Sequence, residues 1–291
     1  FPIAKHAFVT VDAFHAAIFR FSVPAVILLF VLMIREGIAT FQLSGEWMRI
    51  SGLGVIGMCG APSLIFGGLM FTRPEIAAII VATQPLMTVF AQRLLGGDRP
   101  DWISLVCVLA AFLGVVTVVT RWESVLQLKA TEVAGNLMVL VGAFCWVAFT
   151  IATSRYREWS SLKVTALTMS SGAIANTVLA FTLVALGLLT HPGFNDWYEV
   201  RWEMLFLAFI GVLVAMFGWN IGAKKIGALN AMLFINLIPI VTFLVRYWQG
   251  YRFEPIELLG VAIVIAALLT QNITLRLKLQ RDARRANSVT G

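Results

Sequence analysis

The chain has 291 residues, of which 59% are hydrophobic and 13% are charged. Soluble domains carry about 25% charged residues, so composition excludes a soluble protein and predicts that lipid surrounds most of the surface. The net charge of +7 does not call for a nucleic-acid partner, because a basic segment beside anionic lipid accounts for it.

Nine apolar runs are each long enough to cross a bilayer as a helix. They cover residues 13–34, 50–71, 75–95, 102–121, 133–154, 164–190, 202–223, 228–248 and 256–275. The opening residues, Phe1 to Lys5, are typical of the end of a helix. Roughly fifteen further residues of a first helix are therefore expected before Phe1. We predict an all-α polytopic membrane protein with ten transmembrane helices, the first largely missing from this chain.

Residues 53–96 reappear, altered, at residues 207–250 with an offset of 154. The matched glycines and prolines are the most informative, because they constrain backbone geometry. They pair Gly57 with Gly211, Gly68 with Gly222, Pro85 with Pro239 and Gly96 with Gly250. Five spans per half is an odd number, so the repeats are predicted to be inverted in the membrane, as in many transporters. The predicted divisions are 1–130, 131–275 and a basic cytoplasmic tail at 276–291.

The distribution of basic residues predicts the orientation. With both termini placed in the cytoplasm, fourteen Lys and Arg side chains lie on the cytoplasmic side and seven on the outer side. The three cysteines lie within apolar spans, so no disulfide framework is expected. A multi-pass protein of a bacterial inner membrane is the predicted setting.

Two tryptophans lie inside spans, whereas the other seven lie at span ends or in loops, where Trp anchors a helix to the interface. The exceptions are Trp146 and Trp219. An indole N–H in hydrocarbon needs a partner, so each residue faces either a cavity or another helix. An aromatic wall for a solute and ordinary helix packing are both open interpretations.

Small residues form a stripe in each half, which allows close approach of helices. The stripes are Gly57, Gly60, Gly67 and Gly68 in the third span, and Gly211, Ala215, Gly218 and Gly222 in the eighth. They serve either as packing seams or as surfaces that slide during transport.

Pro85 and Pro239 lie in the middle of the fourth and ninth spans, where each is predicted to kink the helix and free a carbonyl. Gln84 and Asn236 lie close to these prolines in sequence. Either the amides bind a polar group of a solute at the midplane, or each satisfies its own kink.

Arg20 is the costliest residue in any span, at about 12 Å from the span's start. An arginine at mid-membrane costs about 2.5–3.5 kcal/mol on insertion scales, so a partner or a function is expected. The partner is either Glu75, which makes the pair structural, or the carboxylate of a solute. His15, near Asp12, is a further titratable residue at the outer end.

Motifs of soluble enzymes are lacking: we find no hydrolase triad, metal-ligand set, phosphate loop or dinucleotide fingerprint. We therefore predict a protein that is not an enzyme and uses neither a cofactor nor a metal.

Several short motifs resemble the EamA family of the drug/metabolite transporter superfamily over nearly the whole chain. They are Pro2–Lys5, Ala16–Phe21, Gln84–Leu86, Gly97–Pro100, Gly142–Trp146 and Asn236–Pro239. Trp219–Gly222, with Gly142–Trp146, is also similar to bacterial aromatic amino-acid exporters. The family's acidic residue after the fourth helix is represented by Asp98, whereas after the ninth it is displaced to Glu254.

The resemblance implies a central cavity between helices one, three, four, six, eight and nine. Together with Arg20, the residues placed there are Lys5, Gln84, Trp146, Trp219, Asn220 and Asn236. It also implies alternating-access export of amino acids or related metabolites. Because both predicted repeats lie in one chain, a monomer can form the whole pathway, although a dimer is possible. The alternatives are a multidrug or nucleotide-sugar-like carrier and, from another class, a signalling or structural membrane protein.

Overall fold

The computed structural model describes residues 6–43, 45–94, 102–120, 129–226, 231, 235 and 237–289, and every regular element in these ranges is helical. The first half contains α2 (Ala13–Glu36), η1 (Ile38–Phe41), α3 (Trp47–Gly54), η2 (Val55–Gly60), α4 (Ala61–Leu69), α5 (Pro74–Ala82), α6 (Gln84–Leu94) and α7 (Trp102–Thr120). The second contains α8 (Ala130–Thr153), α9 (Ser161–Ala185), α10 (Phe194–Glu199), α11 (Arg201–Ala208), η4 (Phe209–Val214), α12 (Ala215–Ile226), α14 (Leu237–Trp248) and α15 (Pro255–Val289).

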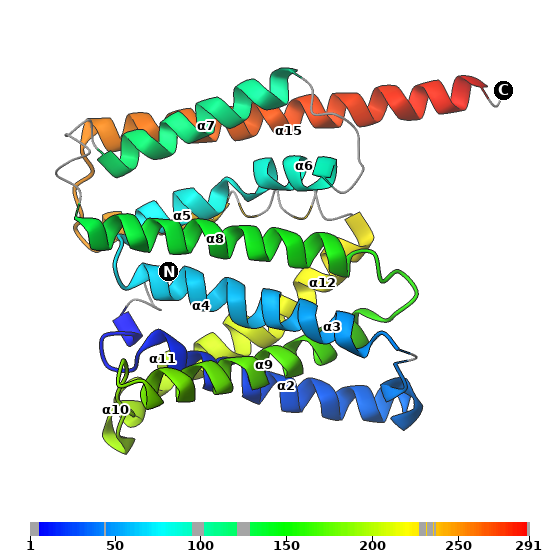
Figure 1. Cartoon of the computed structure of the whole chain (residues 1–291). Coiled ribbons are helices and arrows are strands. Elements are labelled where there is room, and N and C mark those ends of the chain that lie inside the picture. Colours follow the sequence, from blue (N-terminus) through cyan, green and yellow to red (C-terminus); the bar gives the residue numbers. More distant parts are fainter. Residues whose placement is uncertain are drawn as a thin grey trace.

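Helices lie side by side in a bundle whose long axes run roughly parallel (Figure 1). The α7–α15 pair forms one edge and the α2–α9 pair the other, with α8 between them and packed on α4. Six helical stretches in the described ranges are long and apolar enough to span a bilayer, and two shorter apolar stretches cover Ile76–Ala91 and Leu109–Val118. An all-α polytopic membrane protein is confirmed.

The last helix is longer than expected. The ninth apolar run was predicted to end at residue 275 and to be followed by a basic tail, whereas α15 continues to Val289. Residues 276–289 are rich in the strong helix formers Leu, Lys, Arg, Gln and Ala, and they contain neither glycine nor proline. The basic segment therefore extends the helix beyond the bundle (Figure 1).

The fourth span is interrupted near its centre. α5 ends at Ala82 and α6 begins at Gln84, so Pro85 is the second residue of a new helix and loses no helical hydrogen bond there. The Thr83 hydroxyl donates to the Ile80 carbonyl at 2.6 Å. The Thr83 hydroxyl therefore supplies a hydrogen-bond donor to a backbone carbonyl at the break. The Gln84 side chain is not used there and can contact another helix.

Two spans each contain a π-helical segment. Val55–Gly60 interrupts the span formed by α3 and α4, and Phe209–Val214 interrupts the span formed by α11 and α12. The two segments occupy equivalent positions: adding the sequence offset of 154 to residues 55–60 gives residues 209–214. A π-helical segment accommodates an extra residue and rotates the turns that follow.

Glycines in the third span allow very close helix contacts. A Cβ at Gly68 would lie 2.5 Å from the Gly135 carbonyl oxygen, and one at Gly57 would lie 2.2 Å from the Phe149 ring. A Cβ at Gly54 would lie 2.3 Å from the Thr168 carbonyl oxygen of α9. The first half's small-residue stripe is thus a packing seam in this conformation.

Gly54→Ala is expected to lower stability by about 1–3 kcal/mol, because the Thr168 backbone cannot move aside without shifting α9. Thermal unfolding of the purified protein in detergent measures this as a lower Tm. Gly52→Ala is the matched control two residues away, where a Cβ meets nothing within 4 Å. Equal Tm values for the two variants would contradict the close packing.

A buried ion pair joins the ends of three helices. The Arg73 Nη1 atom lies 2.6 Å from Glu257 Oε1, and Glu257 is 1% exposed. Tyr251 donates its hydroxyl hydrogen to the same carboxylate at 3.3 Å, and Arg73 Nη2 donates to the Val118 carbonyl at 3.4 Å. The cluster therefore ties the start of α5 to the end of α7 and the start of α15.

Candidate functional site

One face of α8 carries Trp146 and contacts two further predicted site residues, Gln84 and Trp219. Ala143, Trp146, Thr150 and Thr153 are spaced by three or four residues, so they lie on the same side of the helix. Along this face α8 meets α6, then α12, and finally a small polar pocket. The face thus follows the bundle from its interior towards the end where α8 stops.

Trp146 and Trp219 meet at the middle of this face. Their ring centroids lie 5.6 Å apart at 46°, and Trp146 also contacts Phe149 at 5.4 Å. Trp219 Nε1 donates to Thr150 Oγ1 at 3.3 Å, which supplies the partner that a buried indole requires. Both rings remain partly accessible, so the pair offers an aromatic surface as well as a helix contact.

Gln84 reaches α8 one turn before Trp146. Its Nε2 atom donates to the Ala143 carbonyl at 3.3 Å, while its Oε1 atom is buried and has no partner in the part of the chain that the structure describes. The side chain is 1% exposed. A buried amide oxygen without a donor costs about 1–3 kcal/mol, so this position favours a bound polar group.

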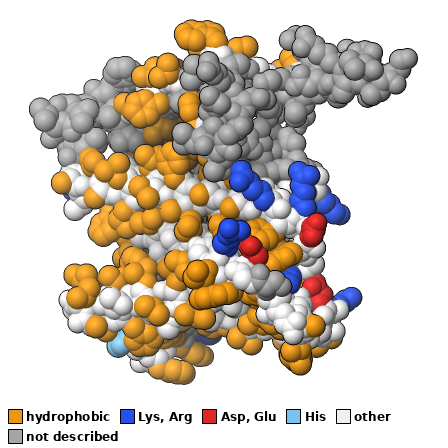
Figure 2. Space-filling view, turned by 45° about the vertical axis from the view of Figure 1, so that its right-hand side comes forward, with side chains coloured by type: hydrophobic (Ala, Val, Ile, Leu, Met, Phe, Trp, Pro, Cys, Tyr) orange, Lys and Arg blue, Asp and Glu red, His pale blue; other side chains and the backbone are white. Residues whose placement is uncertain are grey.

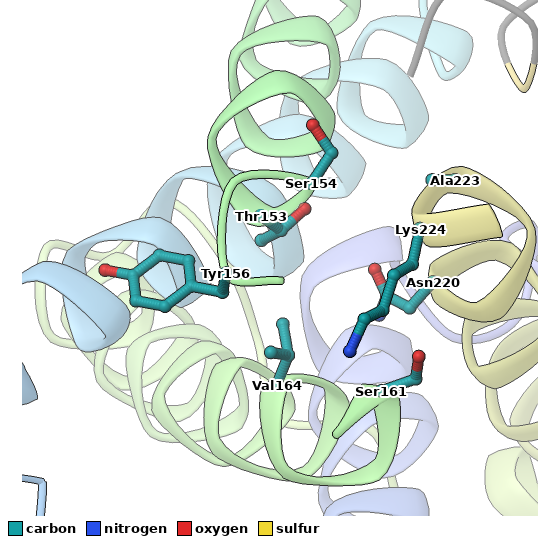
Figure 3. Close-up of a pocket in the computed structure, with 8 residues that line it drawn as sticks. All are labelled: Thr153, Ser154, Tyr156, Ser161, Val164, Asn220, Ala223 and Lys224. Carbon is teal, nitrogen blue, oxygen red and sulfur yellow. The ribbon is translucent and has the colours of Figure 1, made fainter. Parts of the chain in front are cut away.

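Asn220 lies further along the same face, at a polar pocket formed by α8, α9 and α12 (Figure 3). Its Nδ2 atom donates to Thr165 Oγ1 at 2.8 Å. Lys224 points into this region, and its Nζ atom donates to the Trp159 carbonyl at 2.5 Å. The cavity is about 10 Å³, which suits a single water molecule.

Arg20 lies on α2 and contacts Phe66 of α4. It is 4% exposed, and its guanidinium carbon lies 4.4 Å from the centre of the Phe66 ring. Among the described residues its Nε and Nη1 atoms have no hydrogen-bond partner, and no acidic side chain pairs with it. A cation–π contact is worth about 2 kcal/mol when desolvated, which offsets only part of the cost of burying the charge.

Four predicted positions lie outside what the structure describes. Lys5 and Asn236 are outside the described residues, as are the side chains of Glu75 and Pro239. The proposed pairing of Arg20 with Glu75 and the second proline kink therefore stay predictions.

A histidine pair at the opposite end was not predicted. His15 Nε2 lies 3.3 Å from His191 Nδ1, and His15 Nδ1 lies 2.5 Å from Asp12 Oδ2. His15 is 5% exposed, whereas His191 is exposed. The two histidines are 176 residues apart, so their contact has no local sequence signal.

Charged side chains gather at one end of the bundle, and hydrophobic side chains cover most of the described surface around it (Figure 2). This end contains the end of α2, the start of α3, the turn from α8 to α9 and the end of α12. An apolar surface bordered by charged side chains at one end is typical of a membrane protein.

Comparison with known proteins agrees with this architecture. The sequence matches the profile of the EamA-like transporter family over residues 1–120 and 133–272. It is similar to the uncharacterized transporter YrdR of Bacillus subtilis, at 29% identity over 94% of this chain and 86% of the relative. A second uncharacterized transporter of that organism, YyaM, is 29% identical over 95% of this chain and 90% of the relative.

A crystal structure superposes with a TM-score of 0.66 over 94% of this chain and 93% of that chain, at 18% identity, which supports the fold alone. The apolar helices and the similarity to known transporters together identify a multi-pass membrane transporter. The chain belongs to the EamA-like transporter family.

Proposed function

We propose that this transporter carries small organic solutes bearing a carboxylate, with amino acids or related metabolites as the class and export as the direction. The observation that carries the proposal is the set of buried polar atoms without partners, Nε and Nη1 of Arg20 and Oε1 of Gln84. Inside a membrane such atoms are expensive unless a ligand satisfies them. An amino acid offers a carboxylate for a guanidinium and an ammonium for an amide oxygen.

Aromatic solutes are the favoured subset of this class. The Trp146–Trp219 pair lies one turn from Gln84 along α8, so a ring placed against the pair leaves the polar end of the solute near the amide. Offset and edge contacts between aromatic rings add about 0.5–1.5 kcal/mol to their apolar burial.

Alternating access between inverted repeats is the proposed mechanism. The coincidence of the π-helical segments at the offset of 154 supports a repeated architecture. Corresponding spans also run in opposite directions: the α3–α4 span and the α11–α12 span point opposite ways in Figure 1. Two repeats of opposite orientation around a central site can adopt two conformations of similar energy. One conformation opens the site to one side of the membrane, and the other opens it to the opposite side.

A tenth helix is proposed on α12. In the first half α4 places Gly68 against Gly135 of α8. The equivalent position in α12 is Gly222, where a Cβ meets nothing within 4 Å among the described residues, and the same holds for Gly218. A helix packed there would repeat the α4–α8 contact in the second half and complete two five-helix repeats.

Trp146→Ala and Trp219→Ala are expected to reduce uptake of aromatic amino acids by about tenfold or more, because each removes one ring of the pair. Uptake of small solutes such as alanine should fall by less than about threefold, since a small solute gains little from the rings. The measurement is radiolabelled uptake into proteoliposomes.

Trp202→Ala is the control, because Trp202 is 67% exposed at the start of α11. Trp219→Phe keeps a smaller aromatic ring and removes the hydrogen bond to Thr150, so it should retain most aromatic uptake. Equal losses for aromatic and small solutes would contradict the aromatic surface.

The solute class is tested by counterflow in the same proteoliposomes, screening amino acids, cationic drugs and nucleotide sugars against empty vesicles. Amino-acid counterflow supports the proposal. Drug or nucleotide-sugar counterflow alone would favour the other carrier class, and no counterflow of any solute would favour a signalling or structural role.

The proposed location is a bacterial inner membrane with both termini in the cytoplasm, supported by the charged end of the bundle (Figure 2). A monomer is proposed as the functional unit, because both proposed repeats lie in one chain. We propose neither a cofactor nor a nucleic-acid partner.

A further inference from the structure

A groove opens on the side of the bundle between the start of α3 and the end of α8. Its volume is about 540 Å³, within the range of sites that bind small molecules. It is lined by Glu46, Met48, Arg49, Gly52, Leu53, Ile56, Ala152, Arg155 and Tyr156. Of these residues only Tyr156 also lines the small polar pocket described above.

The groove exists because the two spans diverge. At Gly68 a Cβ would lie 2.5 Å from an α8 carbonyl oxygen, whereas at Gly60 the nearest α8 atom is Cys145 Sγ at 3.9 Å. At Gly52 a Cβ would meet nothing within 4 Å. The spans still touch at Gly57, where a Cβ would lie 2.2 Å from the Phe149 ring, so the gap opens only beyond Gly57, towards the charged end of the bundle.

Two kinds of side chain line the groove. Ile56 and Met48 are 41% and 66% exposed, and with Leu53 they form an apolar wall that faces the surrounding membrane. Arg49 and Arg155 lie at the charged end of the bundle, where α3 begins and α8 stops. The apolar wall matches the acyl chain of a membrane lipid, and the two arginines match an anionic headgroup.

The charged end of the groove has a net positive balance. Glu46 pairs with Arg49 at 3.1 Å and accepts a hydrogen bond from the Tyr156 hydroxyl at 3.1 Å. Burial and the Glu46 carboxylate raise the pKa of Tyr156, so this hydroxyl stays a donor at neutral pH. Arg155 is exposed and has no ion pair with any described residue. One carboxylate thus faces two guanidinium groups.

We propose that this groove binds one anionic phospholipid, with its phosphate at Arg49 and Arg155 and an acyl chain along Leu53, Ile56 and Ala152. Guanidinium groups match phosphate oxygens in a bidentate geometry. A lipid is favoured over a soluble anion, because the apolar wall of the groove opens to the membrane. The site does not depend on which solute the protein transports.

Lipid titration of the purified protein, followed by native mass spectrometry and by Tm, tests the site. Phosphatidylglycerol should bind and raise the Tm, and phosphatidylcholine should bind far less. Removing both charges with Arg49→Gln and Arg155→Gln should weaken phosphatidylglycerol binding by about thirtyfold, because each basic residue near a lipid surface contributes about 1 kcal/mol.

Arg157→Gln with Lys225→Gln is the charge-matched control, because both residues are exposed at the same end and neither lines the groove. Gly52→Leu should fill the open space, keep both arginines and the lipid-free Tm, and still reduce lipid binding at least tenfold. Equal losses in the charge-matched control, equal binding of phosphatidylcholine, or the same Tm rise with glycerol 3-phosphate would overturn the proposal.

Discussion

Arg20→Met is expected to raise the thermal stability of the protein while it abolishes most transport of carboxylate solutes. Arg20 is 4% exposed and its charge has no ionic partner among the described residues, so the fold bears the cost of burying it. Methionine fills similar space without charge, and the gain in stability should approach the roughly 2.5–3.5 kcal/mol that insertion scales assign to a central arginine. Loss of the contact to a carboxylate should lower uptake between about tenfold and a few hundredfold.

Tm in detergent and proteoliposome uptake must be measured on the same preparation, because the two readouts are expected to move in opposite directions. Arg20→Lys keeps the charge but loses the planar fork, so its stability should stay near the wild-type value while uptake falls. Lower stability in Arg20→Met with unchanged uptake would show that Arg20 is structural, as a pair with Glu75 would make it.

Arg73→Met should have the opposite effect on stability, with a loss of about 3–5 kcal/mol, because it removes the arginine that neutralises the buried carboxylate of Glu257. Chemical or thermal unfolding in detergent measures the loss. Both substitutions replace an arginine by methionine, but Arg73 is paired with a carboxylate and its side chain is 30% exposed, whereas Arg20 is 4% exposed.

Glu257→Gln in the Arg73→Met background should recover part of this loss, since the double variant buries no unpaired charge. A double variant that is less stable than Arg73→Met would mean that Glu257 stabilises the protein through its other contacts, such as that with the Glu254 amide at 3.0 Å.

Hydropathy alone predicted where helices form, because a chain in lipid must satisfy its backbone internally and a helix does so within one segment. In the fourth span a proline was expected to kink the helix, and the helix is interrupted at Thr83, two residues before Pro85. Periodicity does not reveal the accompanying bond from the Thr83 hydroxyl to the Ile80 carbonyl.

Which faces meet was harder to foresee than where helices lie. Trp146 and Trp219 were identified as unusual from their depth in the spans, but their contact and the Thr150 partner depend on how α8 and α12 are rotated. The π-helical segment before α12 changes that rotation, and nothing in the local composition marks it. The pairing of His15 with His191 joins distant parts of the chain for the same reason.

The paired π-helical segments also bear on the ancestry of the chain. Their surroundings differ: a Cβ at Gly57 would meet the Phe149 ring at 2.2 Å, whereas the nearest atom to one at Gly211 is 3.7 Å away. Pressure from a neighbouring helix therefore does not explain why both spans have the same geometry. A common origin of the two spans would explain it, with the extra residue already present in the segment from which both derive.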